Sequence, residues 1–129
     1  MSPRFIESGP GLPRAPSPIS QAVVVGTHCY VSGQLSVDPS GTFRPGTARE
    51  EAELSFRNVF AALSAAGFSR DDIVFVDIAF LDLADVPAVN SLFAELFPEG
   101  RRPARTIYQA AALPYGGRVK VQAVAVRDA

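Results

Sequence analysis

Arg105 offers the clearest binding chemistry in the sequence. It stands in the segment Pro103-Ala104-Arg105-Thr106, at the start of an extended run. A guanidinium is a planar fork of N–H donors that can grip a carboxylate through two parallel hydrogen bonds. An ordinary surface arginine at a strand end is the simpler interpretation, and composition alone favours it. Arg105 is therefore a candidate carboxylate anchor that needs supporting neighbours.

Three other places carry polar groups that a ligand could use. Ser32-Gly33-Gln34 ends an apolar run, and a glycine there often marks a close approach of backbone to a ligand. Asn58 and Asn90 lie in helical stretches although asparagine is a poor helix former. Gln122 alternates with apolar residues along an extended run. Each place also has a purely structural alternative. Residues 32–34 could be a plain turn, the two asparagines could face solvent, and Gln122 could lie on a partly exposed strand face.

The sequence contains one histidine and one cysteine, His28 and Cys29, which are adjacent and flanked by apolar residues. This setting predicts packing roles for both. A single histidine so placed supports neither a Ser-His-Asp triad nor a metal-ligand spacing. One cysteine forms no disulfide within the chain, and no phosphate-cradling glycine loop occurs. We therefore expect a protein that works without a metal or cofactor.

Local patterns predict the elements that would position these residues. Residues 22–25 and 28–31 form two β runs around the turn Gly26-Thr27, and Ser32-Gly33-Gln34 breaks the second run. Residues 8–18 hold four prolines and two glycines, which favour an extended loop over the surface. A disordered tail is the alternative for this segment.

A first helix is predicted to begin at Thr47, because Glu50 three residues later completes a capping box. Gly67 suits a left-handed end to this helix. One face is apolar through Ala52, Phe56, Val59, Phe60, Leu63 and Ala66. The opposite, polar face is predicted to carry Glu51, Ser55, Arg57 and Asn58.

Residues 73–81 read as a central strand that is covered on both faces. A second helix over 86–97 has Asp85 as its expected N-cap and stops before Pro98. Residues 106–110 and 119–126 complete the order β-β-(β)-α-β-α-β-β. This order predicts an α+β fold of two layers, a mixed sheet with two helices on one face. The other face then needs a cover, and a subunit interface would supply it.

Composition limits the classes of function. The 129 residues suit a single domain over 1–129, and 47% hydrophobic residues indicate a globular chain. The net charge is −1 and the pI is about 5.8, and the sequence has no basic stripe of the kind that nucleic-acid-binding proteins carry. The same charge balance disfavours binding to anionic membranes. The first residues lack the apolar core of a signal peptide. A cytoplasmic protein without nucleic-acid or membrane partners is expected.

Short segments through nearly the whole chain carry a family resemblance. They are residues 18–22, 30–34, 58, 65–67, 72–74, 89–90, 97–98, 103–105, 113–114 and 123–125. Pro-Ala-Arg followed at this distance by Leu-Pro is the most specific of them. Together they resemble the RidA/YjgF family of enamine and imine deaminases, some of whose members carry the older label L-PSP endoribonuclease.

The resemblance implies a chorismate-mutase-like (YjgF-like) fold and a homotrimer whose sheets pack into a central barrel. Ligand clefts would lie between adjacent subunits. In active members the arginine that matches Arg105 holds the substrate carboxylate, while the positions of Ser32, Gly33 and Asn90 help to line the cleft. The substrates are reactive enamines or imines such as 2-aminoacrylate, which water converts to 2-keto acids and ammonia.

Three positions depart from the family pattern. Gln122 stands where active members usually carry a glutamate, Ile19 where they carry a tyrosine, and Ile107 where they carry a cysteine. Glutamine can hydrogen-bond a water but cannot accept its proton at neutral pH, and loss of a general base typically costs ~10²–10⁴ in rate. The two isoleucines would make the cleft more apolar, to suit a bulkier substrate or a ligand that is only bound.

Three functions follow from these observations. The first is an imine deaminase of altered specificity, a hydrolase acting on C=N bonds, with Arg105 and Gln122 as its catalytic residues. The second is a carboxylate-binding or regulatory protein, a reading supported by Gln122. The third, a ribonuclease or translation inhibitor, is disfavoured by the acidic pI and by the lack of a histidine acid/base pair.

Overall fold

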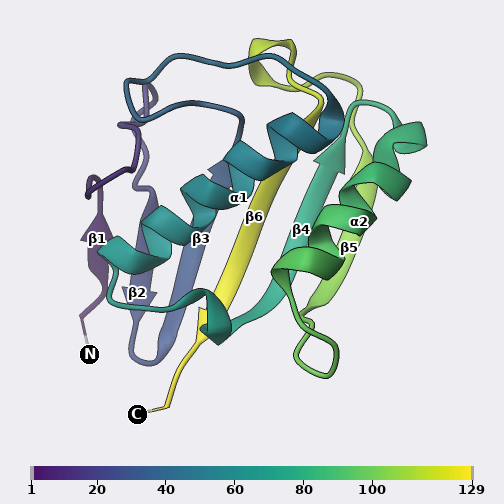
Figure 1. The fold of residues 1–129 in the computed structure, drawn as a ribbon. Helices are drawn as coiled ribbons and strands as arrows, with labels where there is room; N and C mark the ends of the chain where they lie inside the picture. The colour runs from purple at the N-terminus through teal and green to yellow at the C-terminus, as the bar shows by residue number, and fades with distance from the viewer. Residues whose placement is uncertain (1, 129) are drawn as a thin grey trace.

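The computed structural model describes residues 2–128 of the chain. Three strands precede the first helix: the two predicted ones and, before them, a short strand that was not predicted (Figure 1). The optional strand expected after residues 28–31 is not among the described elements, and from the first helix onward the order is the predicted one. The elements are β1 (Arg4–Ile6), β2 (Ala22–Val25), β3 (His28–Gln34), α1 (Ala48–Ala65), β4 (Ile73–Phe80), α2 (Val86–Leu96), β5 (Ala104–Gln109) and β6 (Val119–Val126). Three single-turn 3₁₀ segments join them: η1 (Arg70–Asp72), η2 (Leu83–Asp85) and η3 (Pro114–Gly116).

The strands form one six-stranded mixed sheet in the spatial order β1-β2-β3-β6-β4-β5. Every neighbouring pair is antiparallel except β4 and β5, which run parallel. A parallel pair needs a crossover, and α2 provides it. Both helices lie over the same face of the sheet (Figure 1). The predicted α+β fold, a mixed sheet with two helices on one face, is confirmed.

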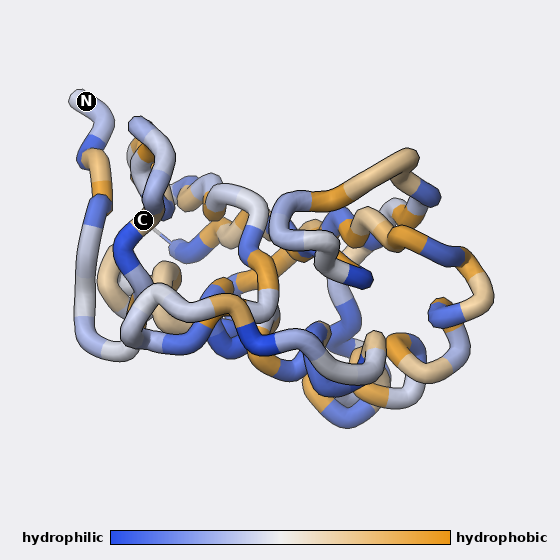
Figure 2. Tube along the Cα trace, turned by 90° about the horizontal axis from the view of Figure 1, so that it is seen from above, coloured by the Kyte–Doolittle hydropathy of each residue, from blue (hydrophilic) through white to orange (hydrophobic). Residues whose placement is uncertain are grey.

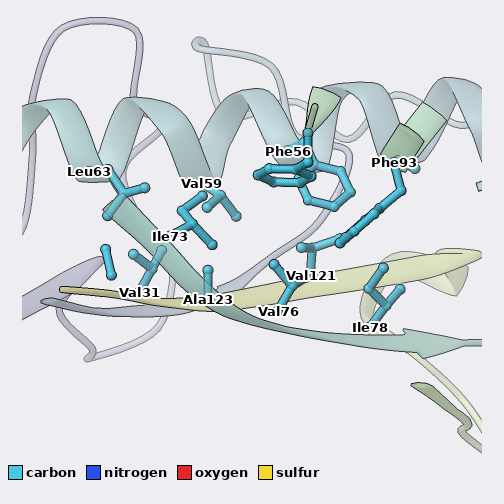
Figure 3. Close-up of a cluster of buried hydrophobic side chains, with 14 of the residues drawn as sticks. Val31, Phe56, Val59, Leu63, Ile73, Val76, Ile78, Phe93, Val121 and Ala123 are labelled. Atoms are coloured by element: carbon cyan, nitrogen blue, oxygen red, sulfur yellow. The ribbon is translucent and has the colours of Figure 1, made fainter. Parts of the chain in front are cut away.

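The core lies between the helices and this covered face. Val76 and Ile78 on β4, together with Val121 and Ala123 on β6, point up toward the helices (Figure 3). All four are buried, and the facing side of α1 contributes Phe56, also buried. Apolar and polar stretches are interspersed along the tube in the view from above (Figure 2).

The opposite face of the sheet is uncovered by any described element. Phe5, Val25 and Tyr30 are large apolar or aromatic residues that stay exposed on this side. The strand over residues 73–81 is therefore covered by the helices on one face only, whereas cover on both faces was predicted. A subunit interface as the second cover stays a prediction. Both helices are too short or too polar to cross a membrane, a finding limited to residues 2–128.

The predictions for His28 and Cys29 have opposite outcomes. Cys29 is fully buried, and this burial raises the pKa of its thiol to about 11. The packing role predicted for His28 is wrong within the chain, because its side chain lies on the uncovered face and is exposed. It stacks against Tyr30 with ring centroids 6.3 Å apart. Strand alternation sends adjacent residues to opposite faces, so both cannot pack in one core.

The N-terminal segment is more structured than its sequence indicates. β1 pairs with β2, although three residues are too few for a periodic signal. Residues 8–18 form an ordered loop: Leu12 is buried, and Gln21 donates a hydrogen bond of 2.7 Å from Nε2 to the Pro13 carbonyl. The predicted surface loop is confirmed in place of the disordered tail.

The capping box of α1 is confirmed, with Thr47 and Glu50 bonded to each other's backbone. Gly67 has the predicted left-handed conformation, φ 83°. The predicted polar face of α1 is wrong, because three of its four members are buried. These are Glu51, Ser55 and Asn58. Glu51 and Asn58 face loops that offer backbone partners, whereas the Ser55 hydroxyl donates to the Glu51 carbonyl within the helix. Periodicity alone does not report such partners.

Two element boundaries also differ from prediction. The break expected at Ser32 is a β-bulge, and β3 continues through it to Gln34. Asp85 makes no side-chain cap to α2. Asp82 instead accepts a hydrogen bond of 2.9 Å from the Ala84 N–H, because the short segment η2 precedes the helix.

Candidate functional site

Arg105 is the second residue of β5 and lies on the side of the sheet covered by the helices. Its register partner on β4 is Val76, which is buried under them. Arg105 donates a hydrogen bond of 2.8 Å from Nη1 to Oδ1 of Asn90 on α2. Its guanidinium carbon also sits 4.9 Å from the centre of the Phe93 ring. Two contacts from one helix therefore fix the direction of the guanidinium.

The support behind Arg105 is rigid. Asn90 and Phe93 are three residues apart on α2, so they share a face. The Phe93 ring packs against Phe97, 4.7 Å between centroids, and edge-on against Phe56 of α1. A cation above an aromatic ring gains about 0.5–2 kcal/mol, depending on how far it is desolvated. This cluster therefore holds the ring in place under the guanidinium.

The remaining N–H groups of Arg105 stay available. A guanidinium has five N–H donors, and Asn90 accepts from one of them. Among residues 2–128, no carboxylate lies within 4.0 Å of Arg105. Ile107, two residues further on the same face of β5, stays 37% exposed beside it. The arrangement suits a carboxylate whose substituent contacts an apolar surface.

Ser32, Gly33 and Ile19 form a second group. The bulge in β3 places Ser32 and Gly33 opposite Gln122, between the pairs that β3 makes with Ala123 and Val121 on β6. Ser32 donates from Oγ to the Ser20 carbonyl at 2.7 Å. This bond ties the N-terminal loop, and with it the half-exposed Ile19, to the bulge.

A cavity of about 220 Å³ lies beside this second group. Ile19 and Gly33 line it, as do Tyr115 and Lys120. Tyr115 has a left-handed backbone, φ 63°, and its ring stacks on Phe43 at 5.3 Å. Left-handed geometry is costly for a bulky residue and often marks a functional site. No sequence pattern predicted this backbone conformation of Tyr115.

Gln122 does not line this cavity, although Lys120 does. The two residues are neighbours on the uncovered face of β6, and Gln122 is paired with Asp77 across on β4. Asp77 accepts a hydrogen bond of 2.7 Å from the Thr106 hydroxyl. A carboxylate therefore stands next to Gln122, which sequence reasoning did not anticipate.

The two groups do not meet within one chain. Arg105, Asn90 and Ile107 lie on the helix side of the sheet, whereas Gln122 lies on the uncovered side. Strand β5 is also three positions from β3 in the sheet, about 14 Å at the usual strand spacing. One small ligand cannot touch both groups of the same chain.

Buried polar residues brace the loop beside the cavity. Asn58 donates from Nδ2 to the carbonyls of Leu35 and Val37, at 3.0 and 2.8 Å. Glu51 accepts from the Arg118 N–H at 2.8 Å. The helical pattern placed both residues on a face expected to be exposed to solvent. The bracing role of Glu51 was therefore not predicted from the sequence. The described residues contain no cluster of three His, Cys, Asp or Glu side chains that could hold a metal.

Comparison with known proteins assigns the chain to a family. The family model described as endoribonuclease L-PSP matches residues 12–127. A curated goat (Capra hircus) protein named 2-iminobutanoate/2-iminopropanoate deaminase is 42% identical over 125 residues, which cover 96% of this chain and 90% of that protein. This chain belongs to the RidA/YjgF family. RidA/YjgF proteins about 40% identical to this chain thus include several that are named imine deaminases.

Solved structures of RidA/YjgF proteins agree with the fold. The crystal structure of RidA from the Antarctic bacterium Psychrobacter is 37% identical with a TM-score of 0.89, covering 96% of this chain and all of that one. The structure of E. coli TdcF with bound serine is 33% identical with a TM-score of 0.88, covering 97% of this chain and all of that one. The YjgF-like architecture predicted for the monomer is therefore confirmed.

Proposed function

We propose that this protein hydrolyses reactive 2-imino acids, and the enamines from which they form, to 2-keto acids and ammonia. The observation that carries the proposal is the Arg105 guanidinium, held by Asn90 at 2.8 Å with its other N–H groups available. The names of the relatives support the reaction class. The serine bound to TdcF supports a small amino-acid-like ligand for the family.

The site is proposed to form between copies of the chain. Arg105, Asn90 and Ile107 would come from one copy, and Ile19, Ser32, Gly33 and Gln122 from its neighbour. The separation of these groups within one chain supports this, because a short carboxylate cannot span about 14 Å and a sheet. The uncovered sheet face, with exposed Val25 and Tyr30, is the surface available for the homotrimer that the resemblance implies.

The proposed chemistry uses positioning more than acid–base catalysis. Arg105 would hold the carboxylate and thereby fix the C=N carbon, and orientation alone is worth several kcal/mol. Gln122 would hydrogen-bond the attacking water. Water adds to the carbon and one of its protons passes to nitrogen, which gives a carbinolamine. The hydroxyl proton then also passes to nitrogen, and the C–N bond breaks to release ammonia and the 2-keto acid. No cofactor is needed for this hydrolysis.

Gln122 favours a second candidate, a protein that binds small carboxylates without turning them over. An amide can orient a water but cannot take its proton at neutral pH. Asp77, its partner across the sheet, is already engaged with Thr106. The same anchor would then serve to sense a 2-keto or amino acid.

A trapping assay separates the two candidates. An amino-acid oxidase generates the imine, semicarbazide traps it, and an active deaminase lowers the rate of trapping. We expect wild type to compete and Arg105→Ala to lose nearly all competition, while Arg101→Ala, an exposed cation outside the site, competes like wild type. Competition by Gln122→Glu alone would support the binding protein. A monomer mass of 13.7 kDa by light scattering would refute the shared site.

A further inference from the structure

Lys120 brings an unusual charge to the cavity beside Ile19 and Gly33. It is the only lysine among the 129 residues of the sequence. Its side chain is half-buried and lines the 220 Å³ cavity together with Arg14 of the N-terminal loop. None of the residues that line this cavity is an aspartate or a glutamate. The cavity therefore carries positive charge without an acidic counterpart.

The charge on Lys120 is not neutralised elsewhere in the described chain. Within residues 2–128, Lys120 forms no ion pair with a carboxylate within 4.0 Å. Arg14 is exposed and also borders a neighbouring hollow that contains Glu7, so its charge is shared. Lys120 is thus the cation that belongs to this cavity.

Gly33 determines where the Lys120 side chain lies. A Cβ atom at position 33 would overlap Lys120 Cε and crowd Cδ and Cγ. The aliphatic stem therefore crosses the β3 bulge directly over the glycine backbone. Only a residue without a side chain leaves this path open. The position of the Lys120 ammonium group therefore depends on glycine at the predicted site residue Gly33.

The size and lining of the cavity indicate what the cation receives. A volume of about 220 Å³ falls below the ~300–1,000 Å³ of pockets for drug-sized ligands and suits a short side arm. Leu35 and Pro114 offer apolar walls. An arm of one or two methylenes that ends in a carboxylate matches both the walls and the charge.

We propose that the preferred substrates carry a second carboxylate, which Lys120 receives: 2-imino dicarboxylates, the imines of acidic amino acids. The inference rests on the proposed function, in which Arg105 of one copy holds the first carboxylate and the cavity of its neighbour completes the site. Lys120 would then select the substrate, while Arg105 anchors it.

Binding of the stable keto-acid products tests this selectivity. Calorimetry would compare 2-oxoglutarate with 2-oxobutanoate on the wild-type protein, for which we expect the dicarboxylate to bind about 10- to 100-fold more tightly, the range of one charge-assisted hydrogen bond. Lys120→Met should bring the ratio of the two affinities to about one, and Lys120→Arg should restore it. Arg57→Met, an exposed cation on α1, is the matched control and should keep the wild-type ratio.

A second measurement uses the single lysine directly. Acetylation of Lys120 by an amine-specific reagent, followed by mass spectrometry, should slow in the presence of 2-oxoglutarate and not with 2-oxobutanoate. Binding of both acids with equal affinity, or protection of Lys120 by neither, would overturn the dicarboxylate proposal while leaving the deaminase proposal intact. Loss of competition in the trapping assay for every imine, with the affinity ratio preserved, would instead refute the deaminase alone.

Discussion

Substitution of Asn58 should destabilise the protein strongly, although its sequence context suggests a surface position. The side chain is 1% exposed and donates to two backbone carbonyls. The Leu35 carbonyl also accepts from the Val37 N–H, so it keeps one partner, whereas the Val37 carbonyl loses the donor from Asn58. An unsatisfied buried group costs about 1–3 kcal/mol and a lost hydrogen bond about 0.5–1.5. We expect Asn58→Ala to lower the free energy of unfolding by about 2–4 kcal/mol.

Urea unfolding at fixed protein concentration measures this change, since association would otherwise shift the midpoint. Ser64→Ala, an exposed residue on the same helix, is the control and should stay within about 0.5 kcal/mol of wild type. A loss below about 0.5 kcal/mol for Asn58→Ala would show that the two hydrogen bonds do not brace the loop.

Asn58→Asp adds a test with a pH dependence. A carboxylate keeps the shape of the amide but faces two carbonyl oxygens without a proton to donate. Burial beside these oxygens raises its pKa in the folded state above the unfolded value of about 3.9. The cost relative to wild type should therefore be smaller near pH 4, where the protonated carboxyl can still donate to one of the two carbonyls, and should grow as the pH rises to about 7. An equal cost at both pH values would contradict the assignment of Nδ2 as the donor.

Three more predictions follow from the described contacts. Burial raises the pKa of the Cys29 thiol to about 11, so folded protein should resist a thiol-reactive disulfide reagent near pH 8, and its stability relative to Cys29→Ala should fall as the pH rises from about 9 toward 11. Hydrogen bonds, foremost the one from Ser40, hold the pKa of Asp38 well below its usual range, so the stabilisation that Asp38 provides is lost as the pH falls below about 4. In Asp38→Asn the midpoint of urea unfolding should therefore fall less steeply below about pH 4 than it does in wild type. Gly33→Ala should displace the Lys120 side chain, so that mass spectrometry detects faster acetylation of Lys120. The free energy of unfolding measured in urea should fall by no more than about 3 kcal/mol, because the displaced aliphatic stem is flexible.

Much of the local structure could be predicted because local patterns carry it. Thr47 and Glu50 signal the start of α1, and Gly67 ends it, since caps depend on residues a few positions apart. The same reasoning failed for Glu51 and Asn58. Their polarity indicated solvent, yet their partners lie 67 and 21 to 23 residues away along the chain. A sequence pattern does not reveal such distant backbone partners.

The sequence by itself determined the strand and helix order, the family and the candidate anchor Arg105, because these depend on short-range spacing and on motifs. The tertiary structure decided which candidates can share a ligand. Strand order places β6 and β4 between β3 and β5, and side-chain alternation then sends Arg105 and Gln122 to opposite faces of the sheet. Strand order and facing both depend on pairing between distant parts of the chain. This pairing separates Arg105 from Gln122, which the sequence analysis had assigned to one site, and it brings Lys120 against Gly33.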